Sequence, residues 1–363
     1  MMGVLTVGNA GTNPVDVELK KLLESKKAHI KIVGSGGAGN NTVSRLMQVG
    51  VVGAEAVVLN TDAQDLLYSD ADLKVLIGKE LTGGLGAGAD PKIGEEAAKE
   101  SRNDIKKIVD GTDLVFVTCG LGGGTGTGSL PVVADTAKKS GALTIGVVTL
   151  PFTMEGKQRM ENAKRGLEKL QSAVDTLIVI PNDRLLEIVP DVSIVSAFKI
   201  CDEILVNAVK GITELITRPG LVNLDFADVK AVMKDGGLAM IGIGDSDGDN
   251  RAVEAVERAL NNPLLDVDIE GAKGALINIC GGTDVTIKEC KDIVEAIASK
   301  LSPDAKIIWG AQIQKELGET IRAMVVITGV SSKQMLDYIP VKAKAGSGEK
   351  KEIEKILGIE FVK

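Results

Sequence analysis

The chain has a single histidine, and its four cysteines form no CxxC pair. Histidine is the side chain most often used for general acid or base catalysis near neutral pH, so that chemistry is excluded. His29 stands just before an apolar stretch and is interpreted as structural. A zinc cluster is not expected from so few ligands, and the thiols are predicted to be reduced and mostly buried. They are Cys119, Cys201, Cys280 and Cys290.

Long apolar runs and dense basic stripes are also missing. No stretch reaches the roughly 18 apolar residues that a membrane-spanning helix needs, and no secretory leader pattern opens the chain. The 50 acidic and 42 basic residues give a formal net charge of -8, so a nucleic-acid backbone is not the expected partner. We therefore expect a cytoplasmic protein without direct membrane insertion. The chain has 363 residues, of which 44% are hydrophobic, and this is enough for two packed domains.

Short β-branched runs alternate with amphipathic helical patterns through the first half of the chain. The pattern predicts strand 30–33, helix 40–49, strand 55–60, strand 73–77, helix 92–109, strand 113–118, helix 129–139, strand 142–149, helix 157–173 and strand 175–180. Such alternation is typical of parallel strands covered on both faces. The predicted fold class is therefore an α/β doubly wound, mostly parallel sheet, which binds ligands at the carboxyl ends of its strands.

A helical pattern over 195–216, ended by Arg218, Pro219 and Gly220, predicts a long central helix. Beyond it the pattern predicts helix 225–234, strand 237–243, helix 251–260, strand 274–280, helix 286–300, strand 306–313 and strand 321–328. The last two strands in succession indicate a smaller mixed α/β domain. The expected organisation is an N-terminal extension with a short helix at 1–29, a nucleotide-binding domain at 30–194, the central helix at 195–220, a C-terminal domain at 221–330, and a linker and tail at 331–363.

Three glycine-rich loops, at 34–39, 83–91 and 119–129, each follow a predicted strand and precede a predicted helix. Glycines let backbone N–H groups approach an anion, and a helix N-terminus favours negative charge, so we interpret these loops as phosphate cradles. A flexible linker is the alternative at 119–129, but linkers are not enclosed by a buried-type strand and an amphipathic helix. At 83–91 an ordinary turn, capped by Asp90 with Pro91 at the first helical position, explains the loop equally well.

The loop at 34–39 matches GxGxxG, and Asp62 ends the next predicted strand, which together fit a dinucleotide-binding fingerprint. A nicotinamide- or flavin-dependent oxidoreductase is therefore one alternative. A second, richer glycine loop at the same predicted sheet edge instead favours one polyphosphate held from two sides. A Walker-type loop needs GxxxxGK followed by Ser or Thr, and the sequence contains no such string.

These motifs resemble the tubulin/FtsZ GTPase family over about residues 30–330. Five segments are similar to motifs of this family and occur in the same order along the chain. They are GGAGNN at 36–41, NTD at 60–62, GAGAD at 86–90, the signature GGGTGTG at 122–128, and NLDFAD at 223–228. The resemblance is closer to FtsZ than to eukaryotic tubulin, and several loops resemble the archaeal forms. It implies a GTP-hydrolysing, self-polymerising filament protein of the mid-cell division ring. A tubulin-like filament protein for cell shape or DNA partition is the alternative within the group.

Carried over position by position, the resemblance implies a set of nucleotide contacts. They are Gly37, Ala38, Gly39, Asn40 and Asn41, the last also reaching guanine; Asp62; Ala87, Gly88 and Ala89; Gly124, Thr125 and Gly126 at the β-phosphate; Glu155 and Arg159 at the ribose and phosphates; and Asn182, Phe198 and Asp202 in the guanine pocket. Mg²⁺ is expected to bind through phosphates and water, not through protein side chains. A carboxylate that accepts two guanine N–H groups would disfavour adenine.

Each of these assignments has a plainer alternative. Glu155 and Arg159 have the i, i+4 spacing of a solvated ion pair, and Phe198 has the character of a core aromatic. Asp225 and Asp228 have the spacing of a helix cap, with both side chains on one side of the helix start.

In the family, the loop that matches Asn223, Asp225 and Asp228 meets the nucleotide of the next subunit. The resemblance therefore implies catalytic carboxylates acting in trans and a head-to-tail homopolymer. The apolar tail at 352–363 is predicted to recruit a membrane tether or division adaptor, with a loose terminus as the alternative.

Overall fold

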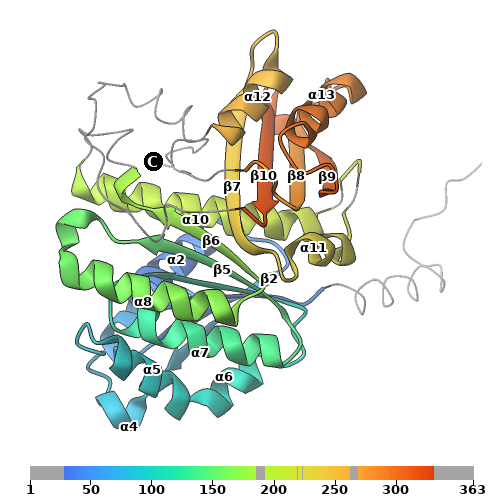
Figure 1. Ribbon diagram of the computed structural model, residues 1–363. Helices are drawn as coiled ribbons and strands as arrows, with labels where there is room; N and C mark the ends of the chain where they lie inside the picture. Colours follow the sequence, from blue (N-terminus) through green and yellow to red (C-terminus); the bar gives the residue numbers. More distant parts are fainter. Residues whose placement is uncertain (1–27, 185–192, 219, 223, 262–268, 331–363) are drawn as a thin grey trace, which may run out of the picture.

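The computed structural model describes residues 28–184, 193–218, 220–222, 224–261 and 269–330. The strands of these ranges form one ten-stranded sheet in the order β3-β2-β1-β4-β5-β6-β7-β10-β8-β9 (Figure 1). They are β1 (Ile30–Ser35), β2 (Ala54–Asn60), β3 (Leu73–Leu76), β4 (Leu114–Gly120), β5 (Leu143–Leu150), β6 (Thr176–Pro181), β7 (Gly237–Ser246), β8 (Gly274–Gly281), β9 (Lys306–Ile313) and β10 (Ile321–Thr328). Every pairing from β3 to β7 is parallel, which confirms the doubly wound sheet.

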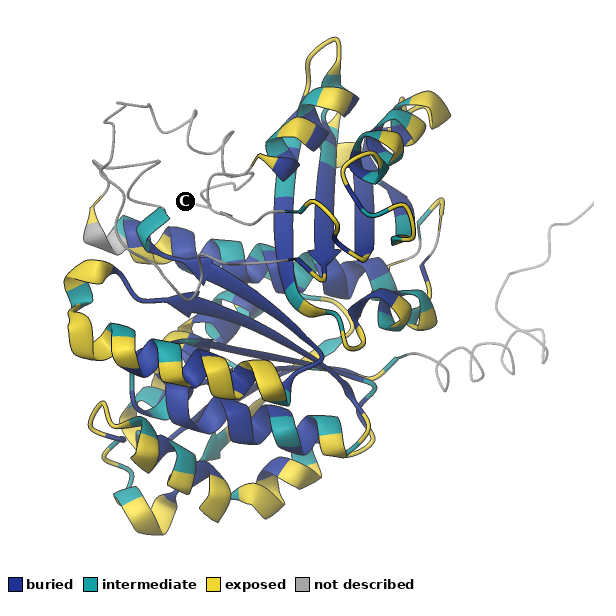
Figure 2. Cartoon of the chain, in the orientation of Figure 1, coloured by how far each residue is buried: buried dark blue, intermediate teal, exposed yellow. Residues whose placement is uncertain are grey.

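Helices lie on both faces of the parallel strands. The helices of the described ranges are α2 (Gly36–Val49), α3 (Ala63–Tyr68), α4 (Lys79–Thr82), α5 (Pro91–Glu100), α6 (Arg102–Val109), α7 (Thr125–Lys139), α8 (Lys157–Ala173), α10 (Ile194–Thr217), α11 (Phe226–Met233), α12 (Arg251–Leu260) and α13 (Ile287–Ala298), with 3-10 turns η1 (Thr153–Glu155) and η2 (Lys315–Leu317). One buried cluster joins the sheet to α2 and α10, and another joins it to α5, α6, α7 and α8. Figure 2 shows the strands between these layers as almost wholly buried.

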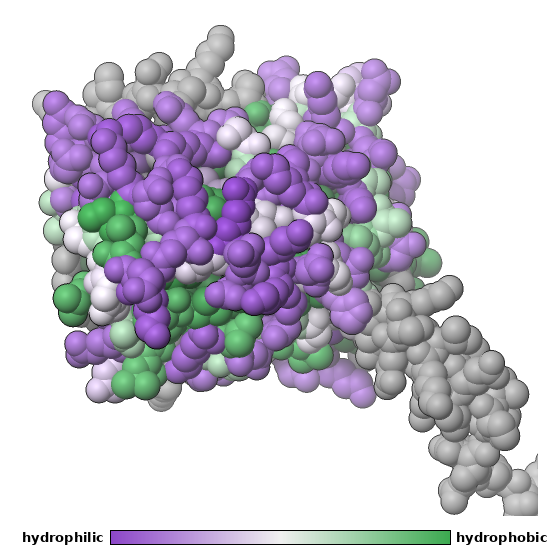
Figure 3. Space-filling model, turned by 90° about the horizontal axis from the view of Figure 1, so that it is seen from below, coloured by the Kyte–Doolittle hydropathy of each residue, from purple (hydrophilic) through white to green (hydrophobic). Residues whose placement is uncertain are grey.

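The outer faces of the helices are polar. Seen from below in Figure 3, the surface is largely hydrophilic, with hydrophobic patches mainly in the left and lower part of the view and smaller ones at the right. The amphipathic patterns that predicted these helices therefore bury their apolar stripes against the sheet. Among the described helices none is both long and apolar enough to cross a membrane. All four cysteines are free and buried, as expected from the sequence.

The C-terminal part is joined to the parallel sheet by a short pairing. Strand β7 pairs with β6 over Thr176↔Gly237 to Ile178↔Ala239, then runs antiparallel to β10. Strands β10 and β8 are antiparallel, whereas β8 and β9 are parallel, so this part is mixed. Its own core lies between these strands and α12 and α13. Helix α10 contributes buried residues to the core that it shares with both the parallel strands and β7, β8 and β10.

Several element boundaries differ from those predicted. Helices α2 and α7 start at Gly36 and Thr125, about a turn before the predicted starts, because Gly37 and Gly39 in α2 and Gly126 and Gly128 in α7, which were taken for loop, lie within the helices. The single helix predicted over 92–109 is divided at Ser101, whose hydroxyl accepts a hydrogen bond from the Gly78 amide. Helices α3 and α4 were not predicted, since six and four residues are too few to show a helical period.

Candidate functional site

The loop after β4 packs directly against the loop after β1. Gly36 has a left-handed φ of +69°, and a Cβ added to it would lie 2.7 Å from the amide nitrogen of Gly126. A Cβ on Gly126 would in turn lie 2.8 Å from the carbonyl oxygen of Ser35. Only glycine fits both positions. The hydroxyls of Ser35 and Ser129, 2.6 Å apart, fix the same contact by a hydrogen bond.

The loop at 83–91 packs against the loop after β4 at the same point. A Cβ on Gly124 would lie 2.9 Å from both the Ala87 Cβ and the Asp90 amide nitrogen. The hydroxyls of Thr61 and Thr125, 2.7 Å apart, connect the end of β2 to the first residue of α7. All three glycine loops therefore meet at the carboxyl ends of β1, β2 and β4.

Two helix N-termini, those of α2 and α7, open onto this meeting point. Neither helix has a side-chain cap, so its first-turn N–H groups are left for another acceptor. Helices of 14 and 15 residues place partial positive charge at these ends. Two such ends beside each other suit a ligand with more than one phosphate. Within the first turns of α2, Gly37, Ala38 and Asn41 are exposed, whereas Gly39 and Asn40 are buried.

Asp62 and Asp90 both act as helix caps. The Asp62 carboxylate accepts hydrogen bonds from the amides of Gln64 and Asp65, at 2.9 and 3.1 Å, at the start of α3. The Asp90 carboxylate accepts from the Lys92 amide at 2.9 Å, with Pro91 at the first position of α5. The capping explanation of the 83–91 loop is therefore correct. It does not remove Ala87, Gly88 and Ala89 from the site, because the loop also contacts Gly124.

Two buried amide oxygens near these strand ends have no partner. Asn40, with 0% of its surface exposed, and Asn182, with 5%, each have a side-chain Oδ1 without a hydrogen-bond donor. Asn40 lies on the second turn of α2, and Asn182 directly follows β6. A buried acceptor without a donor costs about 1–3 kcal/mol. A ligand bearing N–H or O–H groups, such as a nucleoside, would satisfy both oxygens, so the residues fit that ligand.

Phe198 is on the surface of α10, with 42% of its area exposed, so the interpretation as a core aromatic is wrong. Its ring meets that of Phe152 edge to face, with centroids 5.4 Å apart. This contact joins α10 to the segment before η1. The exposed face of the Phe198 ring is available for stacking with a planar ligand.

Asp202 lies one turn further along α10 and faces α2. The hydroxyl of Thr42 donates to its Oδ1 at 3.3 Å. Burial raises the pKa of Asp202 to about 6, an effect that the Thr42 hydrogen bond and the Arg45 charge only partly oppose. The carboxylate is therefore ionised at neutral pH but poorly hydrated. Such a group binds strongly to paired N–H donors.

Glu155 and Arg159 form the ion pair suggested by their spacing, with 2.5 Å between Arg159 Nη1 and Glu155 Oε2. The other Glu155 oxygen accepts from the Phe152 amide at 2.9 Å. The pair lies at the edge of the glycine loops, because a Cβ on Gly122 would be 3.1 Å from the Arg159 carbonyl oxygen. A structural ion pair and a ligand contact are therefore compatible at this position.

Asp225 and Asp228 lie at the amino ends of the parallel strands, opposite the glycine loops. Asp225 lines a hollow of about 930 Å³ together with Ile30 and Lys31, which begin β1, and Glu55 near the start of β2. The glycine loops follow the far ends of these strands, and six residues of β1 span about 20 Å. The structure thus brings the predicted phosphate contacts together but keeps Asp225 and Asp228 away from them. Asn223 lies outside the described residues.

Two polar side chains that hold this site were not predicted from the sequence. Thr42 orients Asp202, and Asn162 of α8 contacts two of the glycine loops from behind. A threonine one turn into α2 is a weak signal. Asn162 carries only the signal of its spacing, three residues after Arg159 on the same helix.

Comparisons with known proteins agree with this geometry. A family model described as Tubulin/FtsZ family, GTPase domain, matches residues 29–190, and one described as FtsZ family, C-terminal domain, matches residues 237–331. The chain is 61% identical over 340 residues to "Cell division protein FtsZ 1" of Thermococcus kodakarensis, covering 94% of this chain and 91% of that protein. It is 58% identical over 340 residues to "Cell division protein FtsZ" of Methanothermobacter thermautotrophicus, covering 94% and 88%. A solved structure, "FtsZ dimer, empty (M. jannaschii)", superimposes with a TM-score of 0.82 at 60% identity, covering 87% of this chain and 92% of that chain.

Proposed function

The chain belongs to the tubulin/FtsZ family of GTPases, and we propose that its hydrolytic site is completed only where two copies of the chain meet. It is a GTPase of the FtsZ cell-division type, which binds GTP and GDP. The oxidoreductase alternative is not favoured by these relatives. One observation carries the proposal: the glycine loops and the pair Asp225 and Asp228 lie at opposite ends of the parallel strands.

Head-to-tail stacking removes that separation. If the amino-end edge of one sheet lies on the carboxyl-end edge of the next, Asp225 of one subunit approaches the phosphates bound by its neighbour. Such a contact repeats without closing and yields a filament. The M. jannaschii relative, which is described as an FtsZ dimer, supports association between copies of a protein of this type.

The residues on the two edges have complementary tasks in GTP hydrolysis. The N–H groups at the starts of α2 and α7 would hold the phosphate oxygens and stabilise charge on the γ-phosphoryl group. Asp225 and Asp228 each use one carboxylate oxygen in their mutual cap and leave the other to accept a hydrogen bond from the attacking water. The water oxygen bonds to the γ-phosphorus as the bond to the bridging oxygen breaks, giving GDP and phosphate. Mg²⁺, held by the phosphates and water, would neutralise charge on the leaving group.

Mixing two defective variants tests the shared site. Asp225→Asn keeps its own nucleotide site but offers no catalytic carboxylate to a neighbour, and Asp202→Ala has the reverse defect. We expect each alone to be nearly inactive and an equal mixture to recover up to about a quarter of the wild-type rate, because random stacking of subunits leaves that share of interfaces complete. A mixture no more active than its two components would refute the shared site. Wild-type activity per subunit should also rise with protein concentration above a threshold.

The filaments are proposed to act in the cytoplasm, in the division ring at mid-cell. A role in cell shape or DNA partition is less well supported, because the relatives are described as cell division proteins. The tail, outside the described residues, would recruit a membrane tether or division adaptor. Deleting residues 345–363 should leave polymerisation intact and abolish that recruitment, and unchanged recruitment would exclude the role.

A further inference from the structure

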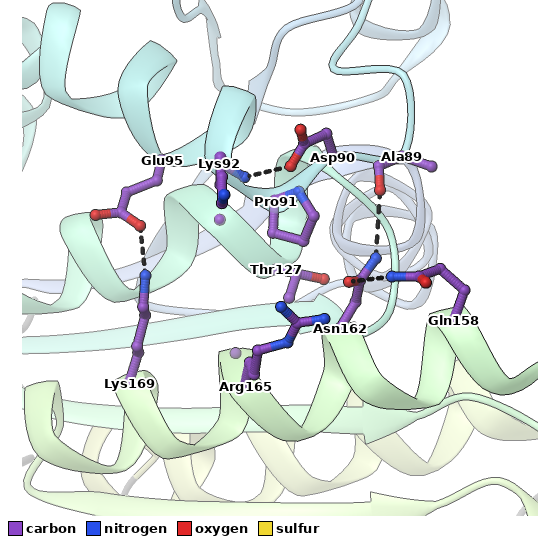
Figure 4. A pocket seen from close by; sticks show the side chains of 12 residues that line it. Ala89, Asp90, Pro91, Lys92, Glu95, Thr127, Gln158, Asn162, Arg165 and Lys169 are labelled. Atoms are coloured by element: carbon purple, nitrogen blue, oxygen red, sulfur yellow. Dashed lines mark hydrogen bonds and ion pairs between the residues drawn. The ribbon is translucent and has the colours of Figure 1, made fainter.

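A cavity of about 380 Å³ lies behind the glycine loops, between the start of α5, the start of α7 and one side of α8 (Figure 4). Its wall includes Ala89 from the 83–91 loop and Thr127 from the first turn of α7. Asn162 of α8 projects into this space from the opposite side. Only 6% of the Asn162 surface is exposed, although asparagine is usually found at the surface.

The Asn162 amide is shared between two loops. Its Nδ2 donates to the carbonyl oxygen of Ala89 at 3.3 Å and to that of Gly122 at 3.5 Å. Its Oδ1 accepts from Gln158 Nε2 at 3.2 Å, one turn earlier on α8. The amide cannot be reversed, because Oδ1 would then face two carbonyl oxygens. The Asn162 amide nitrogen therefore binds the two loops, and the hydrogen bond from Gln158 to its oxygen fixes the orientation of the side chain.

Both acceptors have positive φ angles, and that of Ala89 is unfavourable for a residue with a side chain. Ala89 is a non-glycine residue in the left-handed region, with φ of 61°, and Gly122 has φ of 110°. The Gly122 amide donates to the Thr127 hydroxyl at 2.9 Å, so Gly122 is held by α7 on one side and by Asn162 on the other. The two Asn162 bonds to carbonyl oxygens are longer than the usual 2.7–3.2 Å. They leave room to shorten if the loops move together.

We propose that Asn162 is a positioning residue that couples the 83–91 loop to the 119–129 loop, so that both close together when a γ-phosphate is bound. The inference rests on the GTPase site proposed above and adds a residue that does not touch the nucleotide. It follows that Asn162 stabilises the GTP-bound form more than the GDP-bound form, because only GTP draws the two loops onto a common phosphate.

The isosteric substitution Asn162→Asp tests the coupling, since it replaces the donor that faces both carbonyls by an acceptor. In the full-length protein we expect the affinity for a non-hydrolysable GTP analogue to fall by about tenfold or more and that for GDP to change by less than about threefold. Asn162→Ala should give a smaller loss of the same selectivity. Lys169→Gln is the matched control: it lies on the same helix and cavity wall, contacts Glu95 on α5, and should alter neither affinity.

The outcomes separate this inference from the proposed function. If the wild-type protein binds neither guanine nucleotide, both fail. If it binds both and Asn162→Asp lowers the two affinities equally, or neither, the coupling alone is refuted. Should Asn162→Asp not fold, Asn162→Ala and hydrogen exchange of the wild-type chain decide. Segments 86–90 and 120–124 should then gain protection together with the GTP analogue relative to GDP, and protection of only one of them contradicts the coupling.

Discussion

Asp225 and Asp228 hold each other through reciprocal hydrogen bonds: the Asp228 amide donates to the Asp225 carboxylate at 2.9 Å, and the Asp225 amide donates to the Asp228 carboxylate at 3.2 Å. This capping box begins α11. It accounts for the spacing of the two residues without any catalytic role. Catalysis and capping must therefore be separated by experiment.

Asp225→Ser separates them, because serine caps a helix as well as aspartate but carries no charge. We expect the free energy of unfolding to change by only a few tenths of a kcal/mol and GTP binding to stay near normal, while GTP turnover by polymerised protein falls by at least tenfold. Asp225→Ala, which loses the cap as well, should cost about 1 kcal/mol of stability in addition. Turnover that is normal in Asp225→Ser and reduced only in Asp225→Ala would assign Asp225 to capping alone.

Guanine binding should depend on pH through Asp202, whose pKa is raised to about 6 by burial. The ionised carboxylate accepts the guanine N–H groups, so affinity should be constant above pH 7 and fall about tenfold for each unit below 6. The nucleotide-free protein has the opposite dependence. Between the ordinary value of 3.8 and about 6 the folded chain holds a proton that the unfolded chain has released, so stability falls as pH rises through that window.

Asp202→Asn should abolish the pH dependence of guanine binding and remove the part of the stability change that comes from Asp202. Its nucleotide-free form should be at least as stable as the wild type at pH 7.5, because no buried charge remains, while its affinity for GTP is much lower. Titration of GTP binding and urea unfolding between pH 5 and 8 measure the two effects. A wild-type affinity that is flat across that range would contradict the assignment of Asp202 to guanine.

Local patterns were enough to predict most of the fold. The alternation of β-branched runs and amphipathic helices predicted every strand in the described ranges, and β9 and β10 have the predicted bounds. The glycine loops were also predicted at strand ends, because a burst of glycine between a strand and a helix is a local signal. The start of α7 was placed too late for the same reason: glycine is a poor helix former, but tertiary packing keeps Gly126 and Gly128 helical.

Contacts between distant residues could not be predicted in this way. Thr42 and Asp202 are 160 residues apart, and Asn162 and Ala89 are 73 apart, so no window of sequence contains either pair. The plainer interpretation of Phe198 as a core aromatic is wrong, although an aromatic on a largely apolar helix is usually buried. Its position is set by Phe152, which follows a different strand.

Phe198→Ala should weaken the binding of guanine nucleotides without destabilising the protein. Stacking of a base on an aromatic ring contributes about 1–3 kcal/mol, which corresponds to about 5- to 150-fold in affinity. Because 42% of the side chain is already exposed, little core packing is lost. Phe198→Tyr keeps the ring and should retain affinity within about threefold. If Phe198→Ala binds guanine nucleotides as tightly as the wild type, the ring does not contact the base.

Gly126→Ala tests the close packing of the glycine loops in the nucleotide-free protein. Two effects oppose each other: alanine is the better helix former by about 1 kcal/mol, but overpacking of a tight site costs about 1–3 kcal/mol. The new Cβ would meet the Ser35 carbonyl oxygen at 2.8 Å and the Cys119 Cβ at 3.0 Å. Neither atom can rotate away, since one belongs to the backbone and the other begins a side chain with 0% of its surface exposed. Overpacking should therefore win, and the midpoint of urea unfolding should fall.

Gly123→Ala is the control for this prediction, because it is in the same loop and nothing lies within 4 Å of its added Cβ. There the substitution restricts only the unfolded chain and should leave stability unchanged or raise it by up to about 1 kcal/mol. If the two variants unfold at the same urea concentration, the contact between the loops after β1 and β4 is not as close as the geometry requires. A loss confined to Gly126→Ala would establish that these loops are braced against each other before any nucleotide binds.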